Sequence, residues 1–90
     1  MKEMVVAVGV EDFTIKYFRT CGEYMCDQRD GAVQIFGIVA SKYINDEEKE
    51  SSDAGFISED INFVNKTIET LAKNTVTPMC LFQVLDDMAL

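Results

Sequence analysis

Carboxylates are the side chains whose number and spacing in this sequence could do chemistry. They gather between residues 46 and 60, beside a single cation, Lys49, and they are Asp46, Glu47, Glu48, Glu50, Asp53, Glu59 and Asp60. A dense negative surface attracts basic partners at long range. It repels a phosphate backbone, because carboxylates cannot replace the counterions of a nucleic acid. The block therefore predicts partner binding to a basic protein and argues against direct nucleic-acid binding.

Catalytic machinery is not indicated by the remaining polar residues. The chain has no histidine, so the Ser/His and Cys/His pairs of nucleophilic catalysis cannot be built, and it has no glycine-rich phosphate loop. Adjacent Asp86 and Asp87 fall in a helix-patterned segment, where neighbouring residues point to different faces and do not share a proton. We predict no enzyme, no catalytic residue and no cofactor.

Three cysteines, Cys21, Cys26 and Cys80, leave at least one thiol unpaired and do not resemble the dense frameworks of small secreted proteins. A zinc site would need all three thiolates and a carboxylate. We interpret the cysteines as small packing residues instead, predict no metal site, and favour a reducing cytoplasm.

Length and composition predict one folded domain spanning residues 1–90. Ninety residues, 48% of them hydrophobic, are enough to close one core, and the net charge of −8 favours solubility. The apolar run at residues 4–10 is ended by Glu11 and Asp12, which is too short for a membrane span or a signal peptide. We interpret this run as a strand.

Strand patterns occupy residues 4–44. Residues 5–10 are apolar and β-branched, residues 13–17 alternate apolar and polar, and the polar break between them predicts an antiparallel hairpin. Asp30-Gly31 supplies turn chemistry before a long strand at residues 32–44. Gly37 in that strand indicates a bulge or a close backbone approach.

Helix patterns occupy the last third. Residues 45–57 show no hydrophobic period, so we predict an exposed acidic loop there. Ser58 is the expected N-cap of a helix at about 58–74, which ends at Asn74. Thr77-Pro78 begins a second helix at about 77–89. The fold class is therefore α+β, with a three- or four-stranded antiparallel meander and a two-helix hairpin packed on one face.

A helix-turn-helix can also read DNA, but the second predicted helix does not suit that role. From Asn74 to Leu90 there is no lysine or arginine, so this segment has nothing to offer a phosphate or a guanine edge. We interpret the pair as an αα-hairpin that covers the sheet.

Aromatic residues exceed what one covered sheet face requires. Tyr17 and Phe18 have opposite parity on the same strand, so both cannot lie under the helices. An apolar patch on the uncovered face would be a partner site or a homodimer seam.

The segment at residues 76–88 (VTPMCLFQVLDDM), taken with Phe36-Gly37-Ile38, resembles a family of short uncharacterised bacterial proteins that end in a Pro-x-x-Leu-x-x-Val-x-x-Asp-type helix. The resemblance covers roughly residues 32–90 and implies a fold without an established activity. Cys80 stands where that family tends to have histidine, Gln83 replaces an acidic residue, and Met88 replaces an aromatic one. The chain also has a general likeness to small acidic phage anti-defence inhibitors of the anti-CRISPR type.

Together these patterns predict a non-enzymatic binding module that acts as an inhibitor or regulator, with a phage anti-CRISPR type of nucleic-acid mimic as one form of it. It would dock through the acidic block on a basic, nucleic-acid-binding surface of a larger protein. The alternative is a homodimeric structural or accessory module that associates through an exposed sheet face or edge. An enzyme would require a metal or cofactor that the sequence does not indicate.

Overall fold

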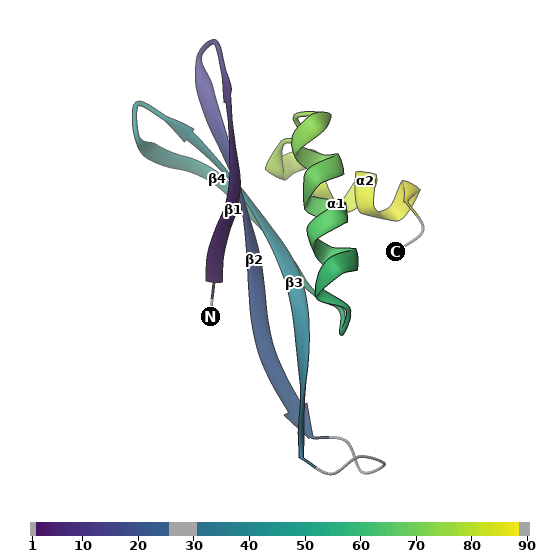
Figure 1. Cartoon of the computed structure of the whole chain (residues 1–90). Helices are drawn as coiled ribbons and strands as arrows, with labels where there is room; N and C mark the ends of the chain where they lie inside the picture. Colours follow the sequence, from purple (N-terminus) through teal and green to yellow (C-terminus); the bar gives the residue numbers. More distant parts are fainter. Residues whose placement is uncertain (1, 26–30, 89–90) are drawn as a thin grey trace.

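The computed structural model describes residues 2–25 and 31–88 (Figure 1). The elements, in chain order, are β1 (Lys2–Val10), β2 (Phe13–Met25), β3 (Ala32–Ile44), β4 (Glu47–Ser58), α1 (Ile61–Lys73), the 3-10 turn η1 (Pro78–Cys80) and α2 (Leu81–Asp87). The strands form one antiparallel sheet in the order β1-β2-β3-β4. The predicted α+β meander followed by a helix pair is confirmed.

The first hairpin and the third strand were predictable because their residues are typical strand formers. β1 pairs with β2 from Val10 opposite Phe13 to Lys2 opposite Thr20. β3 has the predicted bounds and pairs with β2 from Ala32 to Tyr43. The reversal predicted at Asp30-Gly31 falls mainly on residues 26–30, which lie outside the described residues.

The predicted acidic loop at residues 45–57 is wrong, because most of this segment is the edge strand β4. Asn45 and Asp46 have φ of 53° and 65°, which makes a two-residue turn of the type that suits the twist of a hairpin. Asparagine and aspartate tolerate this left-handed conformation. An edge strand gains much of its order from backbone pairing with its one neighbour, so the acids of β4 can remain exposed.

Gly37 provides the close approach that the sequence indicated. A Cβ at Gly37 would lie 2.1 Å from the backbone oxygen of Gly55, which itself has φ of 74°. The register shifts here, with Val39 opposite Asp53 but Gly37 opposite Phe56. Such bulges bend and twist a strand. This bulge brings the backbone of β4 at Gly55 so close to β3 that only glycine fits at position 37.

The helix ends differ in detail from the prediction. Asp60, not Ser58, is the N-cap of α1, and its carboxylate accepts from the backbone N–H groups of Asn62 and Phe63 at 2.9 and 3.3 Å. Ser58 instead accepts from the backbone N–H of Asp60. Asn74 is the C-cap as predicted, but with φ of −98°. The left-handed residue is Thr75, with φ of 49°.

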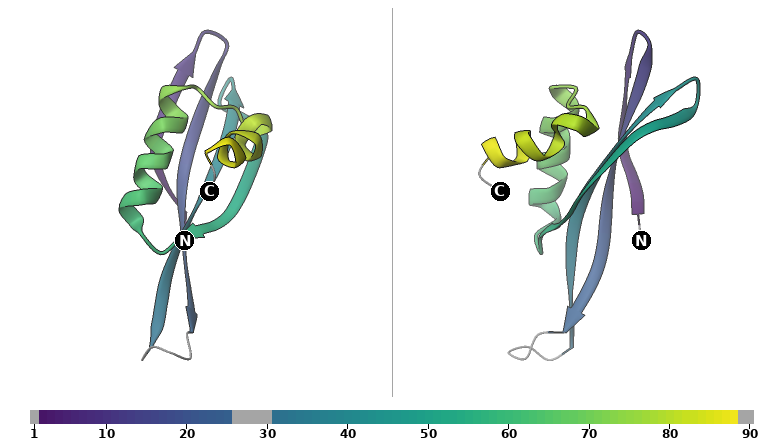
Figure 2. Two further views of the ribbon diagram at one scale, coloured as in Figure 1. Left: turned by 90° about the vertical axis from the view of Figure 1, so that its right-hand side faces the viewer. Right: turned by 180° about the vertical axis from the view of Figure 1, so that it is seen from behind.

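The second helical segment is shorter than predicted. Pro78 opens η1 at its first position, and Thr77 precedes it without a side-chain capping bond. A 3-10 turn there replaces the first turn of the expected helix, and α2 contains seven residues. Both helices lie against the same face of the sheet (Figure 2).

The core lies between that face and the helices. Its buried residues come from β2, β3, both helices and the connection between them, and they are Ile15, Tyr17, Phe36, Ile38, Ala40, Val64, Ile68, Leu71, Val76, Leu81 and Leu85. The apolar stripe predicted on the first helix supplies Val64, Ile68 and Leu71, whereas Ile61 is 37% exposed. The stripe therefore identified the buried face of α1 correctly from its second turn onward.

Tyr17 joins the sheet to the turn between the helices. Its side chain is fully buried, and its hydroxyl donates to the carbonyl of Val76 at 2.7 Å and lies 3.3 Å from that of Leu71. Burial raises the pKa of Tyr17 to about 12, because the phenolate would be poorly solvated there. The neutral phenol thus supplies a donor to the carbonyl of Val76 in the connection after α1, while the Leu71 carbonyl also accepts from the backbone N–H of Val76.

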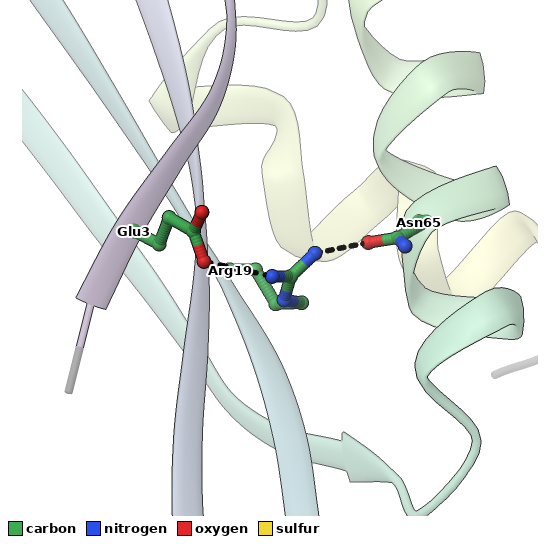
Figure 3. Close-up of polar contacts among 3 residues, drawn as sticks. All are labelled: Glu3, Arg19 and Asn65. Carbon is green, nitrogen blue, oxygen red and sulfur yellow. Dashed lines mark hydrogen bonds and ion pairs between the residues drawn. The ribbon is translucent and has the colours of Figure 1, made fainter.

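Arg19 links three elements through its guanidinium group (Figure 3). It donates to Glu3 of β1 at 2.8 Å and to the side-chain oxygen of Asn65 on α1 at 2.6 Å. The side chain of Arg19 is only 18% exposed. Arg19 therefore links β1 and α1 to β2.

The opposite face of the sheet is uncovered but not flat. Phe18 lies there, half-buried, with the ammonium group of Lys2 4.4 Å from its ring centre. Phe56 is 54% exposed, and its ring lies where a Cβ of Gly22 would be. Tyr17 and Phe18 lie on opposite faces, as their opposite parity predicted, and the structure shows that Tyr17 is the one under the helices.

We expect Tyr17→Phe to lower the free energy of unfolding by about 1–2 kcal/mol, since it removes the buried donor to the carbonyl of Val76. Urea unfolding at neutral pH measures this, with Tyr43→Phe as the control, because the Tyr43 hydroxyl makes no hydrogen bond to the described residues. Equal stability of Tyr17→Phe and wild type would contradict this role.

Wild type and Tyr17→Phe should also differ in how their stability responds to alkaline pH. The unfolded chain loses the Tyr17 proton near the ordinary pKa of 10.0, whereas the folded chain holds it to about 12. The contribution is complete below the lower value and is lost as pH rises through the higher one. The stability difference between wild type and Tyr17→Phe should therefore shrink over this range.

Gly37→Ala should destabilise the fold by about 2 kcal/mol, because backbone atoms of β4 would have to move. Gly9→Ala is the matched control, since a Cβ there meets nothing within 4 Å. It should instead add about 0.5 kcal/mol by reducing the freedom of the unfolded chain. Similar unfolding midpoints for the two variants would refute the packing role of Gly37.

Candidate functional site

The best candidate site is one end of the sheet, where two turns meet a cleft. The turn between β1 and β2 contributes Glu11 and Asp12, and the turn between β3 and β4 contributes Asn45 and Asp46. Figure 1 shows both turns at the same end of the molecule, with the two hairpins splaying apart. We call this region, residues 10–16 and 42–50, the acidic end.

The cleft between the turns has a volume of about 380 Å³. Its walls combine backbone and side chains of both hairpins, and they are Val10, Glu11, Asp12, Phe13, Thr14, Lys16, Tyr43, Asn45 and Asp46. Three of these are carboxylates, and Lys16 is the one ammonium group among them. The cleft is therefore open, polar and predominantly negative.

The lysines of the acidic end are engaged by neighbouring side chains. Lys16 lies 4.2 Å from the ring centre of Tyr43, and Lys42 lies 4.6 Å from that of Phe13. Lys42 is also 3.8 Å from Glu50. Lys49 pairs with Glu47 at 3.3 Å. Cation–π and exposed ion-pair contacts are individually weak, but they hold the ammonium groups close to the protein surface.

Negative charge remains in excess after these contacts. Six carboxylates, three of them in the turns, stand against three lysines, and the acids are Glu11, Asp12, Asp46, Glu47, Glu48 and Glu50. Among the described residues, Asp46 and Glu48 make no hydrogen bond or ion pair. The acidic end can thus offer carboxylates to a cationic partner without first breaking a strong internal contact.

The seven predicted site residues do not form one surface. Asp46, Glu47, Glu48 and Glu50 lie at the acidic end, whereas Glu59 and Asp60 lie beyond the far end of β4. A strand rises about 3.3 Å per residue, so β4 separates the two groups by roughly 35 Å. Within β4, the register pairs Glu50 with Lys42 but Glu48 with Tyr43, which places these two acids on opposite sheet faces.

Several of the predicted acids have structural partners. Asp60 caps α1, the hydroxyl of Tyr24 donates to Glu59 at 2.8 Å, and Asp53 accepts from the backbone N–H of Gly55 at 2.8 Å. These contacts explain why acids occur at these positions without any partner protein. Of the predicted site residues, only those from Asp46 to Glu50 lie close together at the acidic end.

Sequence reasoning missed Glu11 and Asp12, which were interpreted only as a break between strands. The signal was present, because the first and third turns of a four-stranded meander lie at the same end of the sheet. It was overlooked because residues 45–57 were assigned to a loop, so the third turn was not recognised.

The other side chains with chemical potential are dispersed. Cys21 is half-buried against the core and Cys80 is exposed, while Cys26 lies outside the described residues. Among residues 2–25 and 31–88, no group of three or more histidine, cysteine or acidic side chains could hold a metal ion. No helix in this part of the chain is long and apolar enough to cross a membrane.

Comparison with known proteins gives a family without an assigned activity. A family model described as a family of unknown function (DUF6514) matches residues 1–90. The chain belongs to the DUF6514 family. No curated protein and no solved structure matches it. Membership covers the whole chain, while the likeness to a bacterial C-terminal motif and to phage inhibitors stays a prediction.

Crowding of like charges at the acidic end should cost stability at low ionic strength. Asp12→Asn with Asp46→Asn removes two of the three carboxylates of the cleft and keeps a residue that tolerates positive φ at position 46. We expect a higher thermal midpoint than wild type in low salt, and a smaller gain in high salt because ions screen the repulsion.

The control for this comparison is Asp86→Asn with Asp87→Asn, which changes net charge equally at exposed positions of α2. A salt-independent gain in the cleft variant, or an equal salt-dependent gain in the control, would show that the acids of the cleft do not interact.

Proposed function

We propose that this protein is a non-catalytic binding module whose acidic end docks on a basic surface of a larger protein. The single observation that supports this most strongly is the convergence of Glu11, Asp12 and Asp46 on one cleft. A basic surface used for nucleic acid is the preferred target class, because such a surface is built to accept closely spaced anions. Occupying it would inhibit or regulate the larger protein.

Rigidity supports this proposal more than charge alone. Glu11–Asp12 and Asn45–Asp46 each connect two paired strands directly, so the acids sit on short turns between long strands. Ordered groups lose less conformational freedom on binding than those of a mobile tail. Carboxylates held in this way favour fast, oriented association with a cationic surface.

The charge of the whole chain acts in the same direction. A net charge of −8 draws basic proteins from a distance and disfavours approach to a phosphate backbone. The absence of histidine from the full sequence supports a binding role over acid–base or nucleophilic catalysis near neutral pH. Each of these properties is compatible with an inhibitor that imitates the charge of nucleic acid.

A deca-arginine peptide is a defined probe of the acidic end. The test variant neutralises four acids there, through Glu11→Gln, Asp12→Asn, Asp46→Asn and Glu48→Gln. The control variant has the same net charge but neutralises exposed acids elsewhere, through Glu23→Gln, Glu69→Gln, Asp86→Asn and Asp87→Asn. We expect calorimetry to show about tenfold weaker binding for the test variant and a much smaller loss for the control.

Equal weakening in both variants would mean that the peptide responds to overall charge and not to the acidic end. That result would remove the proposed function. Circular dichroism of each variant checks that neutralisation has left the fold intact.

A further inference from the structure

The two edges of the sheet differ in the way they are protected. β4 forms one edge and β1 forms the other. β4 carries Glu47, Glu48, Glu50 and Asp53, and its pairing with β3 is irregular at three places. Charges and bulges are two devices by which proteins keep an edge strand from pairing with another chain. The β4 edge has both.

The β1 edge has neither device over most of its length. From Met4 to Val10 it contains no charged residue, and its pairing with β2 is regular from Val6 to Val10. Three of its apolar side chains are open to solvent, with Met4 51%, Val5 36% and Val10 38% exposed. Uncharged, regular edges of this kind pair readily with a further strand.

The sequence of the regular stretch is symmetric about Val8. Residues 6–10 are Val-Ala-Val-Gly-Val. Val6 and Val8 pack against the core, so they face the helices, and Ala7 and Gly9 therefore face the other way. Bulky residues thus alternate with small ones in the same order whichever way the strand is read.

We infer that β1 pairs antiparallel with β1 of a second copy of this chain, about a two-fold axis near Val8. Val6 then lies opposite Val10 of the second copy, and Ala7 lies opposite Gly9. Valine faces valine on the helix side, and small residues face each other on the open side. Pairs of β-branched residues across an antiparallel seam stabilise a sheet.

Charge also favours pairing of a second copy with the β1 edge over pairing with the β4 edge. Self-pairing of β4 would bring two acidic strands together, which is unfavourable. The β1 seam brings together stretches with no charge, so it avoids the repulsion expected between two molecules of net charge −8. The resulting dimer would be a continuous eight-stranded sheet with its acidic ends on opposite sides, available to two partners.

Sedimentation velocity over a series of concentrations tests this inference. Wild type should show a monomer–dimer equilibrium. Ala7→Lys with Gly9→Lys places lysine directly opposite lysine twice across the seam, and it should raise the dimer dissociation constant about a hundredfold. Both positions are exposed, and a Cβ at Gly9 meets nothing within 4 Å, so the monomer fold accommodates the changes.

A charge-swap mixture makes the test specific. Ala7→Glu with Gly9→Glu should also be monomeric, but an equimolar mixture with the lysine variant should restore the dimer, because opposite charges then meet at each pair. Glu48→Lys on the β4 edge is the control and should dimerise like wild type, or more strongly because it lowers the net negative charge.

A wild type that is monomeric at every concentration would overturn the inference, as would a lysine variant that dimerises normally or a mixture that stays monomeric. If wild type dimerises and Glu48→Lys does not, the seam lies at the β4 edge instead. The seam variants change Ala7 and Gly9, which lie outside the acidic end, so the proposed function is tested separately.

Discussion

The antiparallel meander imposes the constraint on which this structure depends. Consecutive strands run in opposite directions, so the first and third turns must lie at one end of the sheet and the second at the other. The first turn contains Glu11 and Asp12, and the third contains Asn45 and Asp46. Residues more than thirty positions apart in sequence are therefore brought to one cleft. The acidic end is a consequence of strand order and not of local sequence alone.

Much of the fold could be predicted because its elements are locally consistent. β-branched and aromatic residues with a polar break identify β1 and β2, and the same chemistry gave the bounds of β3 correctly. The buried face of α1 follows from Val64, Ile68 and Leu71 at helical spacing. In each case the side-chain pattern agrees with the tertiary environment, which is the situation in which pattern reasoning is reliable.

β4 could not be recognised in this way, because its order comes from a neighbour. Its side chains from Glu47 to Asp53 are charged or small, which is typical of a loop, yet its backbone pairs with β3 after a two-residue turn. The available signal was the Asn45-Asp46 pair, since both residue types are common in turns with positive φ. Of the predicted site residues, those from Asp46 to Glu50 lie together at the acidic end, whereas Asp53, Glu59 and Asp60 lie farther along or beyond β4.

Charge is distributed over the molecule so that different regions have different roles. Arg19 is held between Glu3 and Asn65 inside the scaffold, whereas Asp46 and Glu48 are exposed at the acidic end. The core depends instead on apolar packing and on the neutral hydroxyl of Tyr17. The sheet and helices fix positions, and we propose that the excess carboxylates of one end carry the recognition.

Chemical-shift mapping of the wild-type protein with deca-arginine tests the central claim most directly, because it locates the contact without altering any residue. The account predicts that the perturbed amides cluster in residues 10–16 and 42–50. Perturbations centred on α2, on the uncovered sheet face, or spread evenly over all acidic residues would contradict it.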